Sequence, residues 1–343
     1  MGQITIKDVA RECGISVTTV SRVLSGSSYP VSAGVRAKVE STAKKLGYSP
    51  NILARSLKKS VSNEVAVITP SVVNPFYTAM IKGIEQQLWG SRYGMVIYVT
   101  GQRGRSDEDV IQSLRGKMVA GVIAASDSVS DALLEELVKF KRSNSVPIVL
   151  TDYQRKNDGD ICGVFFDYEK GAALAAEYFL KKGHRRIAFA TNHLDRRSRV
   201  YRYKGFGDML RANGVELGEE NTFFSSGETS FQSGLELSEV ILKSAYHPTA
   251  VAAINDTVAS GILSGLAAKG IKVPEDISVI GFDDIVFAEM SFPPLTTVNI
   301  PVEKMGELAA RRLLDELSGN REPYSIFMQP TLVERKTVRA LIP

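Results

Sequence analysis

The stretch TIKDVARECGISVTTVSRVLSG, residues 5–26, decides how the start of the chain folds. Its first apolar residues share one helical face at spacings i, i+3, i+4 and i+7: Ile6, Val9, Ala10 and Cys13. Thr5 followed by Asp8 fits a capping box at the start of this helix. Gly14 can adopt the positive φ that ends the helix, and Ser16 is a good N-cap for a second one. The sequence therefore predicts two short helices joined by a tight turn.

The second helix has an inner and an outer face. Val20, Val23 and Leu24 form the inner, apolar face. The outer residues are short apart from one arginine, which suits close approach to a DNA major groove: Val17, Thr18, Ser21 and Arg22. A third amphipathic helix follows over 35–46. This pattern is typical of a helix-turn-helix, and the alternative is an unrelated three-helix bundle with a basic surface.

The charge of the chain is unevenly distributed. The whole chain carries +4, but residues 1–62 hold ten Lys or Arg and three Asp or Glu, which gives +7 there and −3 over the remainder. A basic head on a mildly acidic body predicts a polyanionic partner for the head alone.

The body has a different periodicity. From residue 64, short β-branched runs alternate with longer amphipathic runs, in a first set up to 150 and a second set from 163. Apolar strands that alternate with helices are typical of parallel sheets covered on both faces, so we expect two α/β lobes. A 296–300 run, a 302–317 helix and a 325–328 run end the pattern.

Several classes of protein are disfavoured by composition. No apolar run has the length of a membrane span, and the first residues lack a signal peptide, so we expect a cytoplasmic protein. Cys13 and Cys162 lie among apolar neighbours and are expected to be buried thiols rather than a disulfide. The three histidines are not spaced as metal ligands, and we expect no metal and no cofactor.

With these motifs in place, the chain resembles the lactose-repressor/galactose-repressor family. The head motif over 5–26, the run LGYSPN at 46–51 and the run ARSL at 54–57 carry the resemblance, which continues to about Arg335. It implies an all-α helix-turn-helix head and an α/β body with the two-lobed, type I periplasmic-binding-protein-like fold and parallel sheets. The implied domains are a DNA-binding head over 1–49, a hinge helix and linker over 50–62, a first lobe over 63–162 plus about 294–323, and a second lobe over 163–293 plus about 324–340.

The resemblance also implies how DNA is read. In the family, two hinge helices enter the minor groove and a leucine from each kinks the duplex, and Leu57 has that position here. The alternative is a flexible tether with an incidental leucine. The residues expected at DNA are Thr5, Ser16, Val17, Thr18, Thr19, Ser21, Arg22, Asn51, Ala54, Arg55, Leu57 and Lys58.

The ligand would lie between the lobes, at the carboxyl ends of the strands. The implied effector residues are Phe76, Tyr77, Ser126, Asp152, Arg202, Thr229, Phe231, Asn255 and Asp283. Short polar groups at strand ends suit a polyhydroxylated ligand, although Asn255 and Asp283 could instead, or in addition, cap helices.

Two features leave the effector open. Many relatives place a bulky aromatic where Thr229 stands, so either Phe231 replaces it or the ligand differs. A cluster of arginines at one helix start would favour an acidic or phosphorylated sugar, and the alternative is a solvated helix face: Arg196, Arg197, Arg199 and Arg202.

The sequence thus predicts a homodimeric repressor of carbohydrate-metabolism genes that binds a pseudo-palindromic DNA operator and a sugar or sugar-derivative effector. An alternative keeps DNA binding but takes its signal from a protein such as a phosphocarrier protein. A sugar-binding transport receptor is disfavoured by the basic head and the missing signal peptide. A sugar-converting enzyme is disfavoured because no nucleophile, metal or paired-carboxylate motif stands out.

Overall fold

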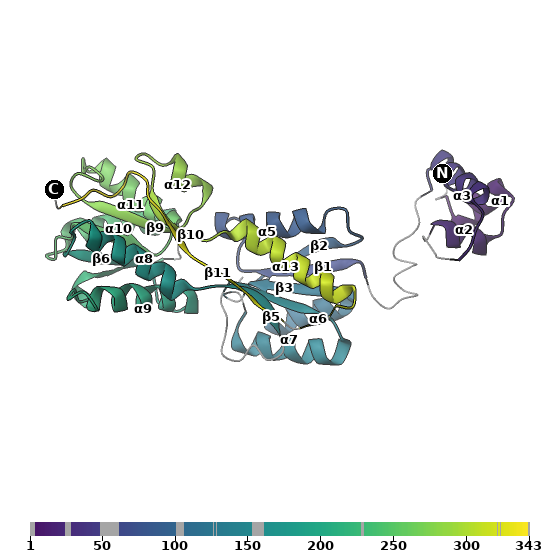
Figure 1. Ribbon diagram of the computed structural model, residues 1–343, viewed down its shortest axis with the longest axis horizontal. Coiled ribbons are helices and arrows are strands. Elements are labelled where there is room, and N and C mark those ends of the chain that lie inside the picture. Colours follow the sequence, from purple (N-terminus) through teal and green to yellow (C-terminus); the bar gives the residue numbers. More distant parts are fainter. Residues whose placement is uncertain are drawn as a thin grey trace. The chain divides into compact units, whose positions relative to one another are not determined.

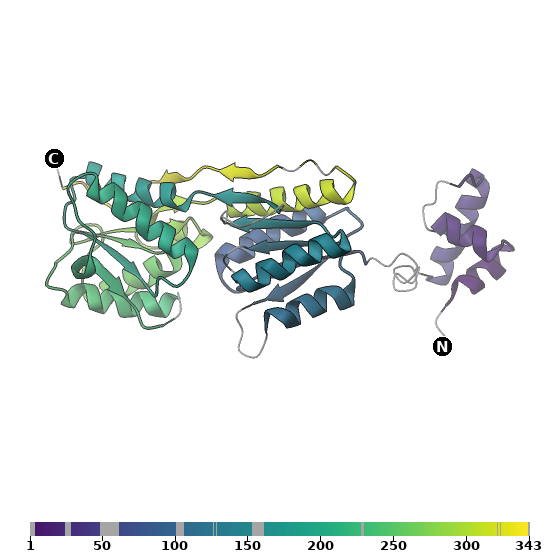
Figure 2. The same cartoon turned by 90° about the horizontal axis from the view of Figure 1, so that it is seen from below.

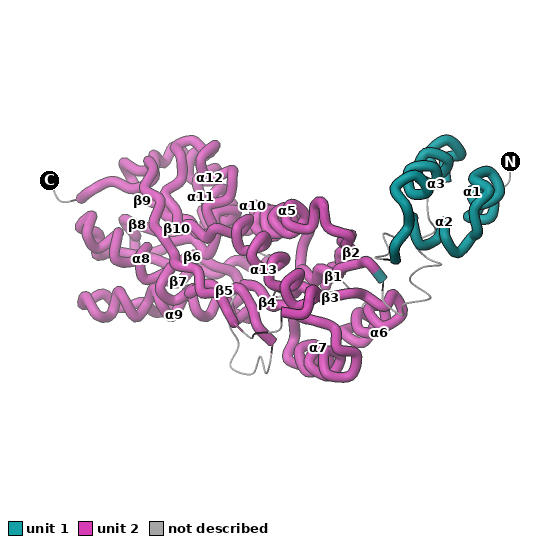
Figure 3. The backbone as a smooth tube through the Cα atoms, turned by 45° about the vertical axis from the view of Figure 1, so that its right-hand side comes forward, with its two compact units in different colours: residues 1–62 teal, residues 63–343 magenta. Residues whose placement is uncertain are grey.

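The computed structural model divides into two units, Met1–Ser62 and Asn63–Pro343, which Figure 3 distinguishes by colour. It describes residues 4–24, 29–48, 62–100, 106–125, 127, 129–152, 161–227, 230–320, 322 and 324–341.

The smaller unit contains three helices, α1 (Ile6–Cys13), α2 (Val17–Leu24) and α3 (Ala33–Leu46) (Figure 1). The predicted capping box is present, since Asp8 Oδ2 accepts hydrogen bonds from the Thr5 N–H at 2.9 Å and from the Thr5 hydroxyl at 2.6 Å. Gly14 has φ 63° and ends α1 as predicted. The predicted apolar faces meet in one core, whose buried residues are Val9, Ala10, Cys13, Val20, Val23, Val39 and Ala43.

The larger unit holds two sheets of six strands each. The first has the order β11-β5-β4-β3-β1-β2, and its pairs are parallel. Its strands are β1 (Glu64–Thr69), β2 (Gly94–Val99), β3 (Gly121–Ala125), β4 (Ile148–Asp152), β5 (Cys162–Phe166) and β11 (Ile326–Met328). The second has the order β12-β10-β9-β8-β6-β7, in which the β10–β12 pair is antiparallel. Its strands are β6 (Ile187–Thr191), β7 (Thr222–Phe224), β8 (Ala250–Ala253), β9 (Ser278–Asp283), β10 (Thr296–Asn299) and β12 (Thr331–Val333).

Helices cover both faces of each sheet, as predicted (Figures 1 and 2). The helices on the first sheet are α5 (Pro75–Leu88), α6 (Asp107–Lys117), α7 (Asp131–Asn144) and α13 (Val302–Leu317). Alternation along β1 shows that they cover both faces, because Val65 and Val67 join the core under α5 and α13 while Ala66 and Ile68 join the core under α6 and α7. The helices of the second lobe are α8 (Tyr168–Lys181), α9 (Arg197–Arg211), α10 (Phe231–Lys243), α11 (Asp256–Ala268), the short α12 (Val286–Met290) and the 3-10 turn η2 (Glu219–Asn221).

The chain crosses between the two lobes at different residues from those expected from the sequence. β5 pairs with β4 in the first sheet, although the sequence placed 163–166 in the second lobe. Likewise β10 pairs with β9 in the second sheet, and β11 pairs with β5 in the first. The chain therefore passes between the lobes after β5, after β10, and between β11 and β12, where the yellow strands of Figure 2 run along both lobes.

Among the described residues, no helix has both the length and the apolar character needed to span a bilayer.

Candidate ligand cleft and nucleic-acid interface

The outer face of α2 presents the side chains predicted to read bases. Val17, Thr18 and Ser21 are exposed. The Arg22 guanidinium lies over the Tyr29 ring, 3.9 Å from its centroid. Ser16 caps α2 as predicted, since its hydroxyl accepts a hydrogen bond of 3.2 Å from the Thr19 N–H.

The other residues predicted to contact DNA lie outside α2. Thr5 is exposed at the start of α1. The hinge candidates Asn51, Ala54, Arg55, Leu57 and Lys58 lie outside the described residues, and their roles stay predictions.

In the larger unit, a cavity of about 750 Å³ lies where strands of both sheets end. Seven of the predicted effector residues line it: Phe76, Tyr77, Asp152, Arg202, Phe231, Asn255 and Asp283. The other two, Ser126 and Thr229, lie outside the described residues. Asn255 lines the cavity and also caps α11, because its Oδ1 accepts a hydrogen bond from the Val258 N–H at 2.9 Å.

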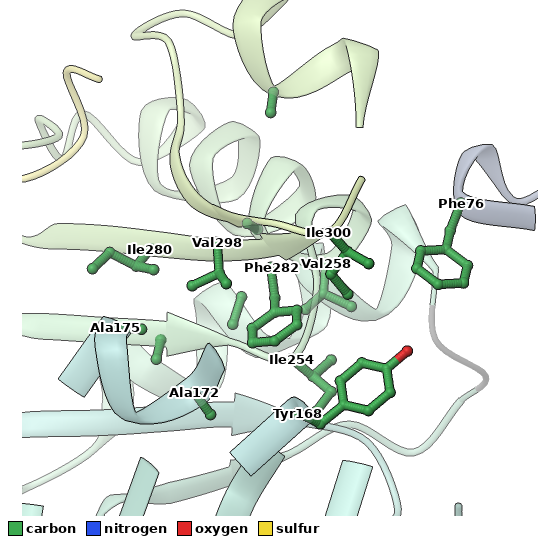
Figure 4. Close-up of a cluster of buried hydrophobic side chains, with 14 of the residues drawn as sticks. Phe76, Tyr168, Ala172, Ala175, Ile254, Val258, Ile280, Phe282, Val298 and Ile300 are labelled. Carbon is green, nitrogen blue, oxygen red and sulfur yellow. The ribbon is translucent and has the colours of Figure 1, made fainter. Parts of the chain in front are cut away.

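Arg202 is fixed deep in the cleft. Its side chain is 9% exposed, and its Nη2 donates to Asp283 Oδ1 at 2.9 Å. Its Nη1 donates to the Ile254 carbonyl at 2.6 Å. The guanidinium carbon lies 4.7 Å from the Tyr168 ring centroid and 4.1 Å from that of Phe282. Those two rings lie next to each other, with centroids 6.0 Å apart (Figure 4).

The two lobes each contribute one buried carboxyl group at a strand end. Burial, together with the nearby Asp127, raises the pKa of Asp152 to about 8, although the hydrogen bond from the Tyr168 hydroxyl acts to lower it. Burial also raises the pKa of Asp283 to about 6, although Arg202 acts in the opposite direction. Both residues have positive φ, 90° for Asp152 and 114° for Asp283. Non-glycine residues rarely adopt a positive φ, and residues that do so cluster at functional sites.

The arginine cluster at the start of α9 is already paired with carboxylates. The pairs are Arg196 with Asp127 at 3.9 Å, Arg197 with Asp131 at 2.9 Å, Arg199 with Asp195 at 2.5 Å and Arg202 with Asp283 at 2.9 Å. Asp127 and Asp131 belong to the first lobe, so two of these pairs join the lobes at the rim of the cleft.

Some cleft residues were missed by the sequence reasoning. Tyr168, Asn192 and Asp127 line the cavity. Tyr168 and Asn192 each come directly after or soon after a strand, so the strand-end rule could have found them. Within the described residues, buried Asn192 Oδ1, Thr191 Oγ1 and Ser225 Oγ have no hydrogen-bond partner. Asn192 lines the cavity, but its unpaired Oδ1 is itself buried in this structure.

Comparisons with known proteins agree with this geometry. Residues 5–51 match the family model of bacterial regulatory proteins of the lacI family, and residues 176–338 match the periplasmic binding protein-like domain. The HTH-type transcriptional repressor PurR of Vibrio atlanticus is 33% identical over 338 residues, which cover 98% of this chain and 99% of that protein.

Two solved structures are similar over nearly the full length. One is a complex of the transcriptional regulator CelR with cellobiose, with a TM-score of 0.71 and 30% identity over 98% of this chain and 100% of that one. The other is the lac repressor dimer bound to operator and the anti-inducer ONPF, with a TM-score of 0.85 and 26% identity over 99% of this chain and 100% of that one.

Proposed function

Because the chain belongs to the lacI family of bacterial regulatory proteins, we propose that it represses genes of carbohydrate metabolism under the control of a neutral, polyhydroxylated effector. The chain is a DNA-binding transcriptional repressor that, like its relatives, works as a dimer on operator DNA and responds to a small molecule. It is not an enzyme. A regulator of transcription must share a compartment with the DNA, so the proposal places the protein in the cytoplasm.

The observation that carries the proposal is the set of fixed polar groups between the lobes. Asp152, Arg202 and Asp283 come from different elements and line one cavity. Each is held by other protein groups, so each offers a ligand hydroxyl a donor or acceptor in a set position. The similar CelR structure contains cellobiose, which is a ligand of this class.

The charge balance favours a neutral ligand over an anionic one. All four arginines at the start of α9 are paired with aspartates. An anionic ligand would have to compete with these carboxylates and would approach the buried carboxylate of Asp283. A neutral sugar needs only hydrogen bonds.

The position of the cleft explains how the effector could act on DNA. A ligand held by both lobes stabilises one lobe arrangement over another, and in a dimer that arrangement sets the spacing of the two heads. Couplings of this kind are typically about 1–3 kcal/mol and reciprocal, so operator DNA changes effector affinity by the same factor.

The test is calorimetry on the full chain with cellobiose, glucose, glucuronate and glucose 6-phosphate, after a thermal-shift screen of a wider panel of neutral, uronic and phosphorylated sugars. We expect binding by a neutral sugar, lost in the Asp283→Asn variant. An acidic or phosphorylated sugar that binds more tightly than its neutral parent would overturn the neutral class. A sugar that binds to Asp283→Asn as tightly as to wild type would contradict the proposal that the cleft is its binding site.

A further inference from the structure

The turn that presents Asp283 to the cleft has an unusual backbone. Asp283 has φ 114° and the next residue, Asp284, has φ 55°. Two successive non-glycine residues with positive φ are costly, and such backbone persists only where surrounding groups hold it. Some group near this turn must therefore stabilise it.

Asp256, the first residue of α11, contacts the turn from inside the lobe. Its side chain is fully buried, and it is not among the residues that line the cleft. Its Oδ2 accepts a hydrogen bond of 2.9 Å from the Ile285 N–H, directly after the two strained residues. Its Oδ1 is 2.5 Å from the hydroxyl of Thr297 on β10.

The neighbouring strand leaves room for this carboxyl group. A Cβ atom on Gly281 would lie 2.1 Å from Asp256 Oδ1, so a side chain there would displace the group. Glycine is the one residue without a Cβ, and its presence in β9 lets the carboxyl group reach both β10 and the turn.

Two further contacts hold the turn at Asp284. Arg335 Nη2 donates to Asp284 Oδ1 at 2.8 Å, and Asn299 Nδ2 donates to Asp284 Oδ2 at 2.9 Å. Held at Asp284 and at Ile285, the turn places Asp283 Oδ1 2.9 Å from Arg202 Nη2 in the cleft.

We propose that Asp256 is a positioning residue that fixes the Asp283–Ile285 turn, and with it the carboxyl group of Asp283, in the ligand-facing geometry before any effector binds. The inference rests on the proposed function, in which Asp283 contacts the effector. Asp256 itself does not touch the ligand and acts through Asp283.

The protonation of Asp256 determines which substitution can replace it. Burial raises the pKa of Asp256 well above its usual range, and the nearby Asp283 raises it further. The raised pKa favours the protonated acid, in which Oδ2 accepts from the Ile285 N–H and Oδ1 pairs with the Thr297 hydroxyl, a group that can donate or accept. An asparagine side chain offers the same pair of functions, whereas alanine offers neither.

The first experiment needs no ligand. Hydrogen–deuterium exchange at the Ile285 amide is measured in the full chain for wild type, Asp256→Asn and Asp256→Ala. We expect Asp256→Ala to raise the exchange rate about tenfold, the effect of one lost hydrogen bond, and Asp256→Asn to stay close to wild type. Equal exchange in wild type and Asp256→Ala would overturn the proposal.

Two threonines give a milder, matched pair in case Asp256→Ala fails to fold. Thr297 holds Asp256, whereas the equally buried Thr337 bonds to Val279 and Thr296 near the starts of β9 and β10. We expect Thr297→Val, but not Thr337→Val, to speed exchange at the Ile285 amide. Equal effects of the two substitutions would show general destabilisation and would contradict a positioning role.

A binding experiment separates this inference from the proposed function. Cellobiose, glucose and glucuronate are titrated into wild type, Asp283→Asn, Asp256→Asn and Asp256→Ala. If Asp283→Asn and Asp256→Ala lose binding while Asp256→Asn keeps it, the result supports both the proposed function and the positioning role of Asp256. Loss in Asp283→Asn alone overturns the positioning role but keeps the proposed function. If none of the sugars binds wild type, the proposed function loses support, and the exchange experiment still decides the role of Asp256.

Discussion

Asp152 shows how one buried side chain connects the cleft to the stability of the whole unit. The pKa of its carboxyl group is raised to about 8, chiefly because the group is buried. In the unfolded chain the same group ionises near its ordinary value of 3.8. Between these values the folded state therefore holds a proton that the unfolded state has lost. Linkage then requires stability to fall as pH rises through this window.

The Asp152→Asn variant tests this link. The substitution removes the titration, so the wild-type free energy of unfolding should fall relative to the variant by about 1.4 kcal/mol per pH unit between roughly pH 6 and 7.5. The measurement is urea unfolding of both proteins at several pH values. Parallel pH profiles would show that Asp152 is already ionised in the folded protein.

In the head, Arg22 is the one long cationic side chain on the outer face of α2. A guanidinium can donate to two acceptors on guanine, so we expect Arg22→Ala to weaken operator binding by about 1–3 kcal/mol and to relax specificity at one base pair. Gel-shift titrations would use an operator selected from random DNA and the same operator with single base changes. An equal loss on selected and random DNA would instead indicate a phosphate contact.

At the scale of residues, sequence reasoning placed seven of its nine effector candidates correctly at the cleft, because parallel strands bring the polar groups at their carboxyl ends to one edge of each sheet. It did not identify the carboxylate partners of the arginines at the start of α9, because sequence spacing does not reveal them. Asp131, for example, lies 66 positions before Arg197 and belongs to the other lobe. The positive φ of Asp283 was also hidden, since no sequence signal marks a non-glycine residue in that conformation.

At the scale of elements, periodicity predicted well whether a segment is a helix or a strand, but it predicted poorly which of the two sheets a strand joins. The 302–317 helix and the head helices have the predicted character and nearly the predicted bounds. β5 was assigned to the wrong lobe because an apolar run of five residues looks the same in either sheet. Its partners are β4 and β11, and pairing with β11 links segments far apart in the chain. Local sequence carries no information about such long-range pairing.

Helix α9 gives a prediction at this scale. Its N-cap residue, Arg196, makes no side-chain capping bond. Instead Asp127 of the other lobe accepts from the Ser198 N–H at 3.5 Å and from the Ser198 hydroxyl at 2.9 Å. We expect Asp127→Ala to lower the free energy of unfolding by about 1 kcal/mol, as the loss of a helix cap does.

The matched control is Asp131→Ala, which breaks the more exposed Arg197–Asp131 pair at the same rim. Exposed ion pairs contribute about 0–1 kcal/mol, so this variant should lose less. Urea unfolding of both variants compares them directly. A larger loss in Asp131→Ala would show that the ion pair, rather than the cap, holds the lobes together at this point.

At the scale of the molecule, the exposed apolar side chains around α12 have the character of a subunit interface. Val286, Phe287, Met290 and Phe292 are exposed, and Phe292 is 97% exposed. Large apolar side chains that gather on a surface usually mark a protein interface. The similar lac repressor structure is a dimer, and a dimer is what allows two heads to bind two half-sites.

We therefore expect the double substitution Phe287→Asp and Met290→Asp to give a folded monomer, because two charges in the apolar patch oppose its burial. Light scattering at micromolar concentration should report the dimer mass for wild type and half of it for the variant, while circular dichroism stays unchanged. Operator affinity should fall to nearly that for random DNA, since one head alone binds only one half-site. A variant that stays dimeric would move the interface elsewhere on the larger unit, and a wild-type tetramer would contradict the dimer itself.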